Sequence, residues 1–266
     1  MGTKTPDGRR LLRGAAALAA ALVAAVGPAF GAAITVYGGA AIPVGGMASG
    51  DYGYFNWLIE DDPGTEHDLV DIRGLTLTGT GGKPCPVAGV RGTVGLAPWL
   101  EAEAAAFHLF TRPNESGPKS AVENPETRIT AATAGAAYVR ALGPFRATAG
   151  GGAGFYFTEV ALSARGEGRS GFVYSNVHTL EDSVRTDGVG AYAGAGVSCP
   201  LGAGLAVSLS GRYHRVFNGG TYQVFIFERY GYDPYHFREY TFDTPLHKEY
   251  DDQFVELGLG LTYGVP

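Results

Sequence analysis

The sequence predicts an all-β fold: an eight-stranded antiparallel up-and-down transmembrane β-barrel with short periplasmic turns and long extracellular loops. Eight alternating apolar segments lie between three sharp turns and four long polar loops. The turns are at Ala97-Pro98, Leu142-Gly143-Pro144 and 200–204, and the loops cover 45–86, 111–127, 161–187 and 218–251. Short and long connections in strict alternation are typical of a closed barrel whose two rims face different compartments.

Composition narrows the class of protein. The 266 residues include 42 glycines, and only 17% are charged, which argues against disorder. After the N-terminal region no run of about 18 uncharged apolar residues occurs, so helical membrane spans are excluded. The net charge of −6 gives no basic face, and the sequence does not support nucleic-acid binding.

The first residues, 1–31, are predicted to be a cleaved secretory signal peptide. Arg9, Arg10 and Arg13 precede an apolar stretch, and Ala29-Phe30-Gly31 places small residues at the −3 and −1 positions of a cleavage site. The alternative is a retained membrane anchor. The barrel domain is therefore expected to cover 32–266.

The strands are predicted at 34–44, 87–96, 99–110, 129–142, 145–157, 188–199, 205–217 and 255–265. Each has one apolar face and one face of small, polar or charged residues, and each is long enough for a tilted transmembrane strand. In the last strand, for example, Leu257 and Leu259 alternate with Glu256 and Gly258. Because arginine and glutamate lie in the middle of the segments on one face only, the apolar face is expected to contact lipid. The alternative is a soluble barrel with the apolar face inside.

The Ala-rich strand at 129–142 has an ambiguous register. Ile129, Ala131, Ala137 and Val139 are predicted to point outward, which turns Tyr138 and Arg140 inward. Eight strands close a barrel just wide enough to be filled by side chains, and inward glycines leave room for inward tyrosines. The inward tyrosines are Tyr37, Tyr138, Tyr156 and Tyr192.

The inward charges are the first candidate site. Unpaired buried charges are costly, so a polar lumen is expected to pair them. The predicted lumen charge network comprises Arg91, Glu101, Glu103, Arg140, Arg146, Arg212 and Glu256, with Arg91 near Glu103 and Arg212 level with Glu256 on the next strand. The network is interpreted as a plug of ion pairs, and alternatively as a gated conduction path.

Two cysteines in an exported protein usually suggest a disulfide. Here Cys85 begins a strand at a long loop, whereas Cys199 ends a strand at a short turn. Opposite rims of a barrel are much farther apart than the roughly 7 Å between Cα atoms that a disulfide allows. The barrel therefore predicts that they do not pair.

Several segments carry the overall pattern of a known family: RGTVGLAPWLEAEA (91–104), LGPFRATAGGGAGF (142–155) and FVELGLGLTYGVP (254–266). With the segment 188–217, they resemble the small outer-membrane barrels of the OmpA/OmpX-like and opacity-type surface proteins, often called porin-like. The resemblance implies a bacterial outer membrane, with lipid, lipopolysaccharide and the barrel-assembly machinery as partners. The even number of strands places both termini at the short-turn side, where a cleaved N-terminus would be left after export, so the termini are expected in the periplasm. Such chains usually end in an aromatic residue, whereas here Tyr263 precedes Gly264-Val265-Pro266.

Other motifs give weaker signals. The segment around His214 is distantly similar to that of outer-membrane lipid A deacylases, but Val216 stands where the serine is expected and Asn218 is displaced. The acidic residues at 60–62 and 66–68 could chelate a divalent cation, or form an ordinary solvated loop. The remaining histidines are scattered, so no metal site and no cofactor are predicted.

The last long loop is the candidate partner-binding segment. It alternates well enough to form two strands that meet at 232–235, as an extension of the flanking strands. Its aromatic residues favour contact with an extracellular protein partner, or belong to the membrane-interface girdle. They are Tyr222, Phe225, Phe227, Tyr230, Tyr232, Tyr235, Phe237, Tyr240 and Phe242.

From these observations we expect a non-enzymatic outer-membrane barrel with a structural or adhesin-like role through its extracellular loops. A narrow channel for small solutes is the alternative, and a lipid A deacylase centred on His214 is the remote one.

Overall fold

The computed structural model describes residues 31–49, 52–55, 75–77, 83–111, 122–169, 175–233, 236–248 and 251–265. Residues 1–30 lie outside this part, and the signal peptide therefore remains a prediction. Within the described residues, no helix is long and apolar enough to cross a lipid bilayer.

Antiparallel strands make up almost all of the fold. The elements are β1 (Ala32–Pro43), α2 (Gly46–Ser49), β2 (Tyr52–Phe55), β3 (Leu75–Leu77), β4 (Cys85–Ala97), β5 (Leu100–Thr111), β6 (Val122–Leu142), β7 (Phe145–Arg169), β8 (Ser175–Arg185), β9 (Gly188–Gly202), β10 (Leu205–Phe217), β11 (Gly220–Asp233), β12 (His236–Lys248) and β13 (Asp252–Val265).

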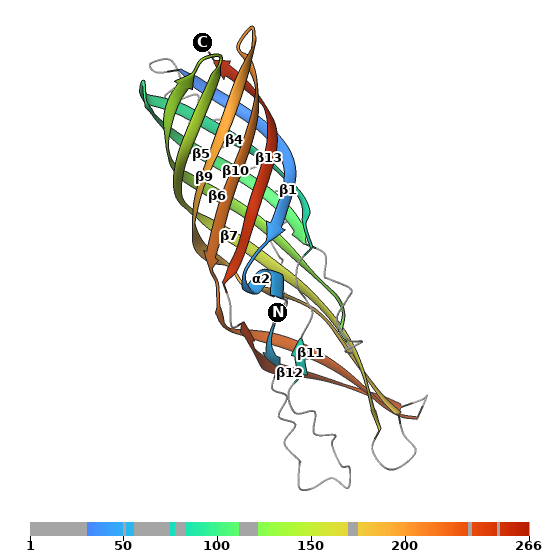
Figure 1. Cartoon of the computed structure of the whole chain (residues 1–266). Helices are drawn as coiled ribbons and strands as arrows, with labels where there is room; N and C mark the ends of the chain where they lie inside the picture. The colour runs from blue at the N-terminus through green and yellow to red at the C-terminus, as the bar shows by residue number, and fades with distance from the viewer. Residues whose placement is uncertain are drawn as a thin grey trace.

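Eight of these strands close into a barrel (Figure 1). Their order is β6-β5-β4-β1-β13-β10-β9-β7, and a further pairing of β6 with β7 completes the circle. Each predicted segment forms one barrel strand. Ala32 pairs with Val265, so the first and last barrel strands have their chain ends at one rim, as an even number of strands requires. The predicted eight-stranded antiparallel barrel is confirmed.

The three predicted short turns join β4 to β5, β6 to β7 and β9 to β10. Positive φ angles explain why glycine occurs in two of these turns. Gly143 has a φ of 62°, and Gly202 and Gly204 have φ values of 100° and 77°. Glycine adopts this backbone conformation without the penalty that a side chain brings. We call the end of the barrel with these turns the short-turn rim, and the other end the long-loop rim.

Apolar side chains cover the outside of the barrel, as predicted. Leu259 is 62% exposed and Phe155 is 64% exposed, and Val36, Leu209, Leu257 and Leu261 are exposed with them. The residues that alternate with them point inward and are buried, among them Tyr37, Arg212 and Glu256. Trp99, Tyr138, Phe145 and Tyr263 are also exposed, and Trp99 and Tyr138 contact each other near the short-turn rim, with ring centroids 6.4 Å apart.

The predicted register of the strand at 129–142 is wrong. Ile129 is 0% exposed, whereas Tyr138 is 53% exposed, so the odd-numbered residues point into the lumen. Cross-strand pairing explains this orientation, because Glu103 on β5 faces Gly135 and Glu101 faces Ala137. Opposite residues in a ladder point to the same side. Tyr138 and Arg140 are therefore on the outer face, and Arg140 is not part of the lumen network.

Beyond the long-loop rim the chain holds more strand than predicted. β6 begins at Val122, β7 continues to Arg169 and β8 pairs with the end of β7, although 111–127 and 161–187 were expected as loops. The regular pairing of β6 with β7 continues past the rim to Val122, across an irregularity between Glu123 and Glu126. Strand pairing thus extends the barrel wall on one side.

The predicted hairpin in the last long loop is confirmed as β11 and β12. It does not simply extend β10 and β13, because it belongs to a separate four-stranded sheet of order β11-β12-β2-β3. Figure 1 shows β11 and β12 beyond the long-loop rim. The side chains of the nine predicted aromatic residues, and the acidic segments 60–62 and 66–68, lie outside the described residues.

The two cysteines do not form a disulfide, as predicted. Cys85 is buried at the start of β4, paired with Ala41 at the long-loop end of β1. Cys199 is paired with Val207 close to the turn between β9 and β10. The two thiols therefore lie at opposite ends of the barrel wall.

Candidate functional site

The polar site of this protein is the barrel lumen, which inward side chains fill in layers. Close packing of large rings against glycine makes this possible. A Cβ atom at Gly89 would lie 2.6 Å from the Tyr37 ring, and one at Gly135 would lie 2.4 Å from the Tyr192 hydroxyl. These glycines give the tyrosines the room predicted from sequence, with Tyr37, Tyr156 and Tyr192 inside and Tyr138 outside.

The layer nearest the short-turn rim is only partly buried. Arg146 forms an ion pair with Glu101, as part of the predicted network, and almost half of the Arg146 side chain is exposed. On the other wall the hydroxyls of Thr35 and Thr262 lie 2.8 Å apart. This layer closes the rim with polar groups that reach solvent.

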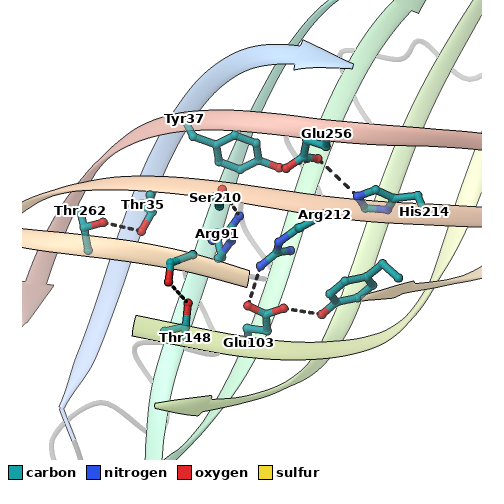
Figure 2. Close-up of polar contacts among 12 residues, drawn as sticks. Thr35, Tyr37, Arg91, Glu103, Thr148, Ser210, Arg212, His214, Glu256 and Thr262 are labelled. Atoms are coloured by element: carbon teal, nitrogen blue, oxygen red, sulfur yellow. Dashed lines mark hydrogen bonds and ion pairs between the residues drawn. The ribbon is translucent and has the colours of Figure 1, made fainter. Parts of the chain in front are cut away.

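The next layer holds a buried ion pair between facing walls. Arg212 Nη2 on β10 donates to Glu103 Oε2 on β5 at 2.7 Å (Figure 2). Tyr192 Oη donates to the other oxygen, Oε1, at 2.6 Å. The Arg212 guanidinium also lies over the Tyr192 ring, 5.0 Å from its centroid. Both Glu103 oxygens therefore accept a hydrogen bond, which offsets the cost of burying the charges.

The partners in this layer differ from those predicted. Arg212 is indeed the cross-strand neighbour of Glu256, but its ion pair is with Glu103. Arg91 was expected to pair with Glu103 and does not. It donates to Ser210 Oγ at 3.5 Å and lies over the Tyr37 ring at 5.2 Å.

A third layer surrounds His214, which is 0% exposed. Its Nδ1 lies 3.0 Å from Tyr156 Oη, and its Nε2 lies 3.6 Å from Glu256 Oε2. Tyr37 Oη donates to the same Glu256 oxygen at 3.5 Å (Figure 2). The imidazole stacks on Phe254, with ring centroids 4.7 Å apart, and contacts Phe107 edge to face.

Sequence reasoning missed these tyrosines and His214 as members of the polar network. The available signal was their position: Tyr37, Tyr156 and His214 share the inward face with the charged residues. They were treated there as bulk that fills the lumen, or, for His214, as a catalytic candidate.

Apolar side chains close the lumen toward the long-loop rim. Phe107 is 1% exposed, and Leu109, Ile129, Val216 and Phe254 are fully buried in the same cluster. Met47 of α2 belongs to this cluster as well, and Val44 N, just before α2, donates to Gln253 O at 2.9 Å. The loop after β1 therefore folds over the barrel end and completes an apolar layer above His214.

A ring of buried hydrogen bonds fixes the same rim. Asn218 Nδ2 donates to Asp252 Oδ2 at 2.6 Å and to Thr186 O at 2.9 Å, and Asp252 N donates to Asn218 Oδ1 at 3.0 Å. These contacts tie together the start of β9, the end of β10 and the start of β13. In the described part of the chain, no three or more His, Cys, Asp or Glu side chains are grouped to hold a metal ion.

Comparisons with known proteins give distant structural relatives. No protein-family model matches the chain, and a search of curated proteins finds no match. Among solved structures, the outer membrane protein OprG from Pseudomonas aeruginosa is similar at 14% identity and a TM-score of 0.45, over 89% of this chain and 97% of OprG.

Two further solved structures show the same level of similarity. A major outer membrane protein from Thermus thermophilus has 10% identity and a TM-score of 0.44, over 89% of this chain and 100% of that one. Ail, the attachment invasion locus protein of Yersinia pestis, has 10% identity and a TM-score of 0.39, over 89% and 99% of the two chains. Because these identities and TM-scores are low, the fold is assigned from the strand pairing within this chain and not from these similarities.

The closed ring of strands, the apolar exterior and the charged, filled lumen define the class of protein: this is the architecture of an eight-stranded outer-membrane β-barrel. It is the architecture that the resemblance to OmpA/OmpX-like proteins implied.

Proposed function

We propose that this protein is a non-enzymatic barrel of a bacterial outer membrane, in which a sealed lumen serves as a rigid scaffold for β-structure displayed outside the cell. The observation that carries the proposal is the apolar layer of Phe107, Leu109, Ile129 and Phe254, all of them buried across the lumen. A lumen closed in this way supports a role at the surface of the barrel rather than transport through it.

The exterior supports the membrane location. Exposed leucine, valine and phenylalanine side chains would be costly in water over such an area, and they match the apolar band of outer-membrane barrels. Exposed Trp99 and Tyr138 near the short-turn rim fit an aromatic girdle at a membrane surface. We assign the short-turn rim to the periplasm, where an exported N-terminus would remain, and the long-loop rim to the exterior.

The structure beyond the long-loop rim supports a surface role. The extended β6, β7 and β8 and the sheet β11-β12-β2-β3 present far more ordered chain than is needed to join barrel strands. We propose that the β11–β12 hairpin and its aromatic residues contact an extracellular protein partner. Outer-membrane lipid and lipopolysaccharide would surround the barrel wall, and the assembly machinery would act on its C-terminal strand.

A narrow channel remains the second candidate, because the half of the lumen near the short-turn rim is polar and holds a small cavity. The deacylase hypothesis has little support, since His214 is enclosed in the lumen with Tyr156 and Glu256 as its polar side-chain partners among the described residues. A lipid hydrolase needs its base and nucleophile open to the membrane.

Two measurements test this proposal. An epitope inserted at 234–235, between the end of β11 and the start of β12, should bind its antibody on intact cells, and the folded protein should give no stepwise ion conductance in planar bilayers. Regular conductance steps would favour the channel. An epitope that is recognised only after the outer membrane is permeabilised would contradict the proposed orientation.

A further inference from the structure

A small cavity in the barrel lumen lies beside two arginines. Its volume is about 20 Å³, room for roughly one or two water molecules. The charged side chains that line it are Arg91, Glu103 and Arg212, and the neutral polar ones are Thr148, Tyr192 and Ser210. Three inward glycines, Gly150, Gly194 and Gly196, form much of the remaining wall.

The charges around this cavity do not balance. Glu103 is engaged at both oxygens, by Arg212 and by Tyr192. Arg91 has no carboxylate within ion-pair distance among the described residues, and its buried Nε has no hydrogen-bond acceptor. Its side-chain contacts are the long hydrogen bond to Ser210 Oγ and the Tyr37 ring. One guanidinium is therefore left over at the cavity wall.

The other carboxylate of the lumen does not compensate Arg91 directly. Glu256 lies on the far side of Tyr37, whose ring faces Arg91 and whose hydroxyl donates to Glu256. Glu256 also lies beside His214 and is not part of the cavity wall. Because a buried charge without a partner is costly, the cavity is a place where a small negative ion would be stabilised.

We propose that the lumen binds a single halide ion, chloride under physiological conditions, between Arg91 and Arg212. Arg91 supplies the uncompensated charge, and Ser210 and Thr148 supply hydroxyls that can donate to the ion. The bound ion would offset the excess positive charge of the cavity wall, which holds two arginines and one glutamate.

Bromide gives a direct test on the folded full-length barrel. Crystals grown in sodium bromide should show an anomalous-scattering peak in the cavity, beside the Arg91 and Arg212 guanidinium groups. The same peak should be absent from Arg91→Met and present in Arg146→Met. Arg146 is the matched control, because it is also a lumen arginine but already pairs with Glu101 at the rim.

Stability in solution gives a second readout, first on the wild-type protein and then on two Arg91 variants. At constant ionic strength, urea unfolding should shift to higher midpoints when chloride or bromide replaces methanesulfonate. At a halide concentration of ten times the dissociation constant, the unfolding equilibrium constant should fall about tenfold. Arg91→Lys, which retains the charge, should keep part of the shift, and Arg91→Met should lose it.

The proposal is overturned if wild-type crystals in bromide show only water in the cavity, or if the bromide peak survives in Arg91→Met. It is also overturned if unfolding midpoints in chloride and methanesulfonate coincide across the concentration range.

Discussion

Arg212 and Glu256 are direct cross-strand neighbours on β10 and β13, yet Arg212 forms its ion pair with Glu103 on the facing wall of the barrel, 2.7 Å away. The pair therefore links strands that are not adjacent in the sheet. A contact across the lumen resists changes in barrel shape in a way that a contact along the wall does not. This relationship makes the lumen a structural core built from charges.

Loss of one partner of this pair should be costly. Both side chains are only 7% exposed, so Arg212→Met leaves Glu103 buried without its counter-charge and should lower the free energy of unfolding by about 3–5 kcal/mol. The double variant Arg212→Met with Glu103→Met should recover much of this loss. Urea unfolding in detergent micelles, arranged as a double-mutant cycle, measures both effects. Equal and additive losses would show that the pair is not coupled.

The corrected register of β6 can be tested at Ala134, which is exposed on the outer face. Ala134→Arg places a charge near the middle of the apolar band and should lower the free energy of folding into bilayers by about 2–4 kcal/mol. Ala134→Leu is the matched control and should fold like the wild type. In the opposite register residue 134 would point into the lumen, where leucine would clash and arginine could pair. A larger loss of folding free energy for Ala134→Leu than for Ala134→Arg would therefore contradict this structure.

Phe107 points into the lumen and Phe155 points outward, so substitutions at these two positions measure lumen packing and lipid contact independently. Phe107→Ala removes a ring from the closed layer and should lower the free energy of unfolding by about 3–5 kcal/mol, because the space cannot be refilled. Phe155→Ala, on the outer face, should lose only the transfer contribution, about 1.5–3 kcal/mol, because lipid fills the gap. Unfolding midpoints of both variants, measured in the same lipid, show which substitution causes the larger loss of stability. A larger loss for Phe155→Ala would place the packed core outside the lumen.

Asn218 should be a stabilising residue of the long-loop rim. Asn218→Ala leaves the buried Asp252 carboxylate without its donor at 2.6 Å and should cost about 1–3 kcal/mol. Hydrogen exchange should speed up at the Asp252 amide, which donates to Asn218 Oδ1. Tyr213→Phe is the control, since it removes an exposed hydrogen bond to Gln253 at the same rim and should change little. Unchanged exchange at Asp252 in Asn218→Ala would rule out this role.

The sequence predicted the number of strands, the three short turns and the faces of seven strands, because an apolar row of residues marks the outer face of those strands. It failed for β6, where alanine occupies both faces. The usable signal was weak: Thr133 and Gly135 share the inward face, and Tyr138 with Trp99 belongs to an exposed aromatic pair. Ile129 and Val139 were placed outward because they are apolar, whereas apolar residues also close the lumen near its ends.

The ion-pair partners within the lumen were less predictable from the sequence than the inward orientation of the side chains. Alternation fixes which side chains point inward, and Arg91, Glu101, Glu103, Arg212 and Glu256 were all placed correctly. The choice of partner depends on strand tilt and on contacts across the barrel, which a linear sequence does not give. The strands beyond the long-loop rim were missed for a different reason, since their polar composition is also typical of loops.

The most direct test of the central claim, that the apolar face contacts lipid while the polar network is enclosed, is spin-label accessibility in reconstituted bilayers. Labels at Leu209, Leu259 and Phe155 should collide freely with oxygen and little with a water-soluble nickel complex, whereas a label at the inward Thr262 should show low oxygen accessibility. Labels at the three outer positions that collide with the nickel complex, or that are immobilised as in a packed core, would contradict the account.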